Sequence, residues 1–145
     1  MKQAFLIALC SFFFLTNCSL SDDNNQNNTT YKTYWHLVNT TGGVAGVDDD
    51  FDLEEIVWFF DEENMILTVE NNNSDTTKED ALESGTYDYS ITNDDTNYFL
   101  FIDSTEFGSY TISSSEFVID QNITTTGTLD DGFQYTFKRV LVAQN

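Results

Sequence analysis

An acidic stretch in the first half of the chain has the spacing of residues that bind metal ions. Carboxylates recur there at alternate positions, as the first ligands of an EF-hand loop do: Asp48, Asp50, Asp52 and Glu54. Carboxylate oxygens are the hard ligands that calcium requires. The rest of the EF-hand pattern is missing, because Leu53 stands at the position of the turn glycine and Phe59 at that of the bidentate glutamate. The stretch is therefore either a calcium site or a solvated acidic loop.

The sequence lacks the combinations of residues that enzymes commonly use. His36 is the only histidine in the chain, so a Ser-His-Asp system and a histidine-rich metal site both lack parts. The 25 acidic residues offer many carboxylate pairs, and none is distinguished by its neighbours as a glycosidase pair. We therefore expect no enzymatic activity and no cofactor, apart from calcium at the acidic stretch.

Aromatic side chains are the other residues that could form a binding site. Six of them are expected to point inward and are candidates to line a cavity for an apolar or planar molecule: Trp35, Trp58, Tyr87, Tyr89, Tyr110 and Tyr135. Tyrosine hydroxyls would orient such a ligand. The same side chains could instead simply fill the interior of a small barrel.

These side chains belong to short runs in which every second residue is apolar, so the elements formed by these runs must hold them in place. Such runs, closed by Gly, Asn, Asp or Ser, predict β-strands over Lys32–Asn39, Glu54–Asp61, Met65–Glu70, Gly85–Thr92, Tyr98–Asp103, Gly108–Ser113, Glu116–Gln121 and Gly132–Val142. Most connections are too short for parallel crossovers and suit antiparallel hairpins. Eight such strands predict an all-β fold, an eight-stranded antiparallel up-and-down barrel, because closure removes exposed edges. A β-sandwich is the alternative.

The two long connections carry further expectations. Residues 77–83 are a candidate short helix within the connection 71–84. Gly42, Gly43 and Gly46 are not followed by Lys-Ser/Thr, so they form no phosphate-binding loop, and we expect them to be hinges of a mobile lid at the barrel mouth. Two runs, 56–60 and 99–102, are apolar on both faces, so a loop or a partner must cover their outer side.

The amino terminus has the organisation of an export signal. Lys2 precedes an almost uninterrupted apolar run over residues 4–15, which is too short to span a bilayer permanently. The following Leu15-Thr16-Asn17-Cys18 resembles the lipobox of bacterial lipoproteins, with Asn17 where a smaller residue is usual. This resemblance implies a signal peptide over 1–17, cleavage before Cys18, and a lipid on that cysteine that anchors the protein to a membrane.

The residues after Cys18 and the overall charge limit the possible partners. Residues 18–30 are polar, acidic and free of aromatics, which predicts a disordered tether before a domain over 31–145. Ser19 followed by Asp22 and Asp23 resembles the acidic export signal of some surface lipoproteins. The formal net charge of −20 argues against nucleic acid as a partner. Because Cys10 leaves with the signal and Cys18 is acylated, no disulfide is expected.

A second resemblance concerns the barrel. Trp35 on the first predicted strand, a glycine-rich first long connection and Arg139 on the last strand resemble bacterial lipocalin-like lipoprotein domains, although Thr33 stands where lipocalins usually have glycine. The resemblance implies that Trp35 and Arg139 form a structural pair. It implies an outer-membrane lipoprotein of the cell envelope, with a barrel that binds a small apolar molecule or an envelope protein partner. The alternative is a structural or interaction lipoprotein with a filled barrel and no small-molecule ligand.

Overall fold

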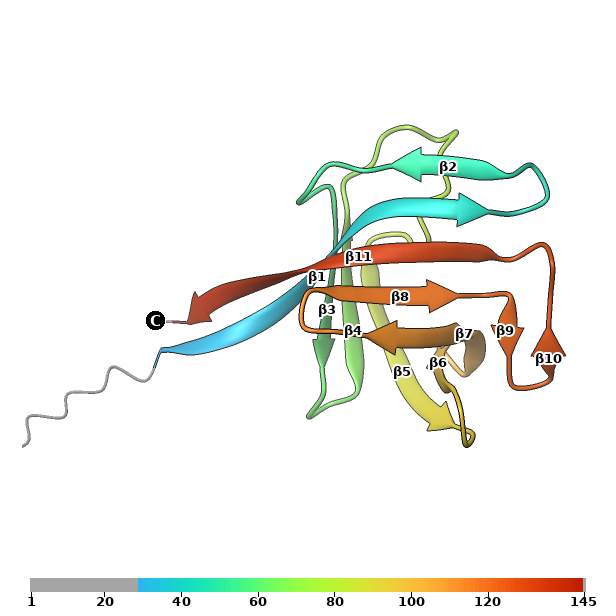
Figure 1. Ribbon diagram of the computed structural model, residues 1–145. Helices are drawn as coiled ribbons and strands as arrows, with labels where there is room; N and C mark the ends of the chain where they lie inside the picture. Colours follow the sequence, from blue (N-terminus) through green and yellow to red (C-terminus); the bar gives the residue numbers. More distant parts are fainter. Residues whose placement is uncertain (1–28, 145) are drawn as a thin grey trace, which may run out of the picture.

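Alternation of apolar and polar residues produces a closed barrel of eight antiparallel strands in chain order (Figure 1). The computed structural model describes residues 29–144. The barrel strands are β1 (Thr30–Gly42), β3 (Ile56–Asp61), β4 (Ile66–Asn71), β5 (Gly85–Asn93), β6 (Tyr98–Ile102), β7 (Thr105–Ile112), β8 (Glu116–Asp120) and β11 (Phe133–Gln144). All eight predicted strands and the up-and-down barrel are thus confirmed, and the sandwich alternative is wrong.

The lipobox, the signal peptide 1–17 and most of the tether 18–30 lie outside the described residues. Within the described part of the chain there is no helix long and apolar enough to cross a membrane.

The pairing of β1 with β11 closes the barrel. Their ladder runs from Thr30 opposite Gln144 to Gly42 opposite Phe133, with one irregularity between Leu37 and Asn39. On its other side β1 pairs with β3 only at Trp35 and His36. The first residues of β1 and the last of β11 therefore extend beyond the barrel as a two-stranded ribbon, seen at the left of Figure 1.

Aromatic rings fill the middle of the barrel. Trp58 is completely buried, and its ring lies 4.8 Å from that of Phe137 and 5.8 Å from that of Phe107. Tilted ring pairs at such distances stabilise beyond the apolar area that they bury. Since the domain has no disulfide among its described residues, this packing is a main source of its stability.

The first part of the acidic stretch forms a hairpin strand with β1, and the glycine turn before it is not a lid. Residues Val47–Asp50 form β2, which pairs with β1 over Asn39–Gly42. The turn between them needs glycine: Gly42 has φ +109°, and a Cβ atom there would lie 2.5 Å from the carbonyl oxygen of Gly132. The N–H of Gly43 donates to that same oxygen. The prediction of lid hinges at a barrel mouth is therefore wrong, because this turn is packed against the start of β11.

The predicted helix over residues 77–83 is also wrong. This part of the chain contains turns, bends and irregular backbone, and no helix. Asp75 Oδ1 accepts hydrogen bonds from the N–H and the hydroxyl of Thr77, a local alternative to helical bonding. Ala81 has φ +70°, which no helix residue adopts. Long-range contacts, described below, hold the segment in this shape.

The two doubly apolar runs are covered within the chain. On β3, the ring of Phe59 lies 5.2 Å from that of Tyr34, and the Lys32 ammonium lies over it. On β6, Phe99 is buried to the same degree as the inward Leu100. A small hairpin of β9 (Ile123–Thr124) and β10 (Gly127–Thr128), too short to predict from alternation, is fixed to β7 because Glu106 accepts two hydrogen bonds from Thr125.

Candidate functional site

One end of the barrel is hollow. The hollow measures about 340 Å³ and is lined by inward side chains of β1, β3, β5, β6, β7 and β8 and by the β3–β4 turn, namely Trp35, Phe60, Glu62, Met65, Tyr89, Ile91, Leu100, Tyr110, Ile112 and Phe117. We call this hollow the cup. Its volume falls within the range of small-molecule sites, which are mostly apolar with a few polar groups.

The floor and walls of the cup are aromatic. Phe60 meets Tyr89 edge-on at 5.1 Å and Phe117 edge-on at 5.8 Å. Trp35 lies 5.5 Å from Phe117. These side chains fix one another by packing, so the apolar surface at the floor exists before any ligand arrives.

The rim of the cup exposes apolar side chains. Met65, Ile91 and Ile112 line the hollow and are 40, 46 and 60% exposed. Tyr98 extends this rim, because its ring lies 5.8 Å from that of Tyr110. Exposed apolar residues that gather around a hollow mark a binding surface, whereas scattered ones do not.

The polar groups of the cup are two tyrosine hydroxyls and one carboxylate. Burial raises the pKa of Tyr89, and the neighbouring charges of Glu62 and Asp61 raise it further. Burial also raises the pKa of Tyr110. Both hydroxyls are therefore neutral at physiological pH and can donate or accept a hydrogen bond.

The cup opens at the ribbon end of the barrel. Its lining residue Trp35 is in the first half of β1, opposite Trp58 of β3. From there β3 runs toward the start of β1 and the turn that supplies Glu62 and Met65. Gly42 is at the other end of β1. The cup is therefore not at the Gly42 turn, where the glycines were expected to be the hinges of a lid.

The opposite end of the barrel is closed by the connection between β4 and β5. We call residues 72–84 the strap. The hydroxyl of Tyr135 donates a 2.9 Å hydrogen bond to Glu79 Oε1, and the N–H of Glu79 donates to Asp49 Oδ2. The Lys78 ammonium donates to the carbonyl of Asp50 and lies over a neighbouring ring. Side chains from β2 and β11 thus hold the strap across this end.

The structure separates the six predicted ligand-binding aromatics. Trp35, Tyr89 and Tyr110 line the cup. Trp58 is buried in the core, and Tyr135 lies under the strap. The six therefore do not form one site.

Tyr87 also lies away from the cup. Its hydroxyl donates to the carbonyl of Glu83. The remaining lining residues were not among the candidates; alternation places several of them inward, but only the three-dimensional structure tells which end is open.

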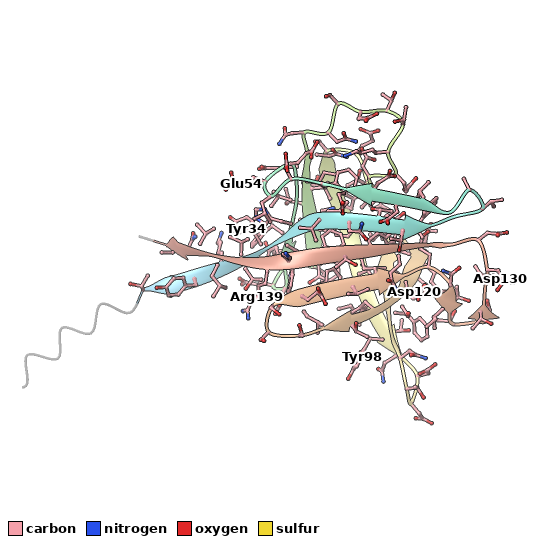
Figure 2. The ribbon with its side chains drawn as sticks, turned by 45° about the horizontal axis from the view of Figure 1, so that its top comes forward. Tyr34, Glu54, Tyr98, Asp120, Asp130 and Arg139 are labelled. Atoms are coloured by element: carbon pink, nitrogen blue, oxygen red, sulfur yellow. The ribbon has the colours of Figure 1, made fainter. Side chains whose placement is uncertain are left out.

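Trp35 and Arg139, the predicted structural pair, are directly opposite each other in the β1–β11 ladder. The guanidinium of Arg139 donates to Thr33 Oγ1 at 3.2 Å and to the carbonyl of Ser114 at 3.4 Å. Figure 2 shows Arg139 at the side where the ribbon leaves the barrel, away from Asp130. Arg139 thus joins the ribbon to the β7–β8 turn at the cup end.

The four alternating carboxylates of the acidic stretch do not converge. Asp48 and Asp50 both accept hydrogen bonds from the Asn39 amide, at 2.9 and 3.0 Å. Asp52 and Glu54 lie beyond the end of β2, in the turn that leads to β3. Within residues 29–144, no group of three or more His, Cys, Asp or Glu side chains is placed to hold a metal ion. Calcium binding here stays a prediction.

His36 is buried between β1 and the residues before β3. Its Nδ1 accepts a 2.9 Å hydrogen bond from the N–H of Glu54, which has φ +72°. This bond requires an unprotonated Nδ1. Burial lowers the pKa of His36 and outweighs the nearby Glu54 charge, which raises it. The histidine is thus a structural acceptor.

A second hollow, beside the β9–β10 hairpin, has a different character. It measures about 540 Å³ and its lining includes three acidic side chains, Glu106, Asp130 and Asp131. Both oxygens of the Glu106 carboxylate already accept hydrogen bonds from Thr125. The cup, with its preformed aromatic floor and free polar groups, is the better candidate site.

Comparison with known proteins adds no relative: no family model matches the chain, and neither a curated protein nor a solved structure is significantly similar to it. The lipocalin-like and lipobox resemblances therefore depend on the residues quoted for them. Of what the lipocalin-like resemblance implies, the structure confirms the barrel fold only.

Proposed function

We propose that this protein is a membrane-anchored envelope lipoprotein that binds a small apolar molecule in its cup. The observation that carries this proposal is the 340 Å³ hollow with an aromatic floor and an exposed apolar rim. Transfer of apolar ligand surface from water to such a floor contributes about 25 cal/mol per Å². A ligand with a flat ring system fits best, since aromatic walls favour stacked and edge-on contacts.

The proposed anchor agrees with the direction of the cup. Cys18 would carry the lipid, and the chain enters the barrel at Thr30, through the ribbon at the cup end. In this proposal the cup faces the membrane side of the molecule, from which apolar molecules would arrive. The location is the cell envelope, at the outer membrane.

The apolar rim and floor favour a small ligand over a filled, purely structural barrel. The alternative of an envelope protein that docks on the doubly apolar strands is weakened because Tyr34 and Lys32 cover Phe59. Phe99 of the second such strand is only 1% exposed.

The test is a calorimetric titration of the purified protein with 1-naphthylmethanol, a neutral aromatic probe. We expect saturable binding of one molecule per chain with a negative heat-capacity change, the robust sign of apolar burial. The variant Ile112→Lys replaces an apolar rim contact with a charged side chain and should weaken binding. Leu129→Lys is the matched control, because Leu129 is 56% exposed and Ile112 60%, and Leu129 is remote from the cup.

Wild-type protein that does not bind the probe would contradict the proposal. So would equal loss of binding in both variants, because that result would place the probe elsewhere. The anchor is tested separately: Cys18→Ser should release the protein from the membrane fraction, and persistence there after a high-salt wash would contradict lipidation.

A further inference from the structure

The charge in the cup has one sign only. Glu62 is the single charged residue that lines the cup. The described residues include four Lys and Arg side chains, Lys32, Lys78, Lys138 and Arg139, and none of them lines it. A bound molecule therefore meets one carboxylate and no ammonium or guanidinium.

Within residues 29–144 the Glu62 carboxylate is unengaged, unlike its neighbour. Asp61 Oδ1 accepts hydrogen bonds from the N–H groups of Glu63 and Asn64, and its Oδ2 accepts one from the Asn64 side chain. Among the described residues, no group donates to Glu62. The turn thus uses Asp61 to hold its own shape and leaves Glu62 free at the edge of an apolar hollow.

The walls of the cup favour a positive charge as well. Aromatic faces attract cations within about 6 Å of the ring centroid, and Trp is the strongest of them. Trp35, Tyr89 and Tyr110 present such rings in the cup. The Tyr89 hydroxyl, which lies in the field of Glu62 and Asp61, stays neutral and can accept a hydrogen bond from an ammonium group.

We infer that the ligand of the cup is an apolar ammonium compound, with an aromatic or aliphatic body on the floor and its cationic end at Glu62. This inference rests on the proposed function and adds the ligand class. It disfavours fatty acids and other apolar anions, which would bring a carboxylate against Glu62 in a protein of net charge −20.

The test compares three probes with one ring system, titrated at pH 7.5 by calorimetry. They are the cation 1-naphthylmethylammonium, the neutral 1-naphthylmethanol and the anion 1-naphthaleneacetate. The amine should bind wild-type protein about fivefold to tenfold more tightly than the alcohol, as expected for one exposed ion pair together with cation–π contacts. The acetate should bind most weakly. In Glu62→Gln the ratio of amine to alcohol affinity should fall severalfold, to the smaller preference that the cation–π contacts alone supply.

The matched control is Glu63→Gln, which removes the same charge from the next residue of the turn, a residue that does not line the cup. It should keep the wild-type ratio. Both positions are exposed, so neither change threatens folding, and equal melting temperatures would verify this.

Two results would overturn this inference and leave the proposed function standing. They are equal affinity of amine and alcohol in wild-type protein, and an equal loss of preference in both variants. The second result would mean that the general negative field, and not Glu62, selects the cation. Absence of binding by all three probes would instead overturn the proposed function itself.

Discussion

The two ends of the barrel are made of the same kinds of side chain, but one end is open and the other is covered by the strap. Inward aromatics stand at both: Trp35 and Tyr110 at the cup end, Phe133 and Tyr135 at the strap end. The connections differ. At the strap end, residues 72–84 are long enough to fold across the opening and place Glu79 on the Tyr135 hydroxyl.

At the cup end the connections are short turns. Residues 62–65, 94–97 and 113–115 join β3 to β4, β5 to β6 and β7 to β8, and turns of this length cannot reach across a barrel. The comparison shows that loop length at each end, and not the choice of inward side chains, decides which end of this small barrel is open.

The largest expected difference between packed and hollow regions concerns the two tryptophans. Trp58→Ala should lower the free energy of unfolding by about 3–5 kcal/mol, because packed atoms surround this side chain completely. Trp35→Ala should cost less, because part of its ring borders the cup. Urea unfolding of both variants measures this. An equal or larger cost at Trp35 would mean that the cup is not hollow in solution.

A second comparison removes one hydroxyl from each end. Tyr135→Phe breaks a part-buried hydrogen bond to a carboxylate and should lower the free energy of unfolding by about 1.5–3 kcal/mol. Tyr110→Phe should change it by well under 1 kcal/mol, since its hydroxyl donates no hydrogen bond to a described residue. Chemical denaturation of the pair measures the difference. Equal effects would contradict the strap as the element that closes its end.

The alternation of residue types is local, and so the strands could be predicted from it. All eight barrel strands lie within a few residues of their predicted positions. The strap could not be predicted, because its shape depends on Tyr135 and Asp49, which are distant in sequence from Glu79. For the same reason Trp35, Tyr89 and Tyr110 could be identified as inward residues but not assigned to one end. The glycine turn could not be assigned to the closed end, because sequence alone does not tell which end of β1 is at the open end of the barrel.

A smaller change in the free energy of unfolding is expected when the pH is lowered, because of His36. The pKa of His36 in the folded protein lies below 6.5, its usual value, so the unfolded chain binds more protons as the pH falls through 6.5. The free energy of unfolding should therefore decrease between pH 6.5 and the lower folded-state value. As the chain has one histidine, its NMR titration is unambiguous. A folded-state pKa at or above 6.5 would contradict the buried acceptor role.

The most direct test of the open-end account is an NMR titration of the assigned protein with 1-naphthylmethanol. The account predicts that the resonances of Trp35, Tyr110 and Ile112 shift and saturate together, whereas those of Glu79 and Tyr135 under the strap stay in place. Shifts that gather at the strap end, or that spread over both ends without saturation, would contradict a single binding cup at the ribbon end of the barrel.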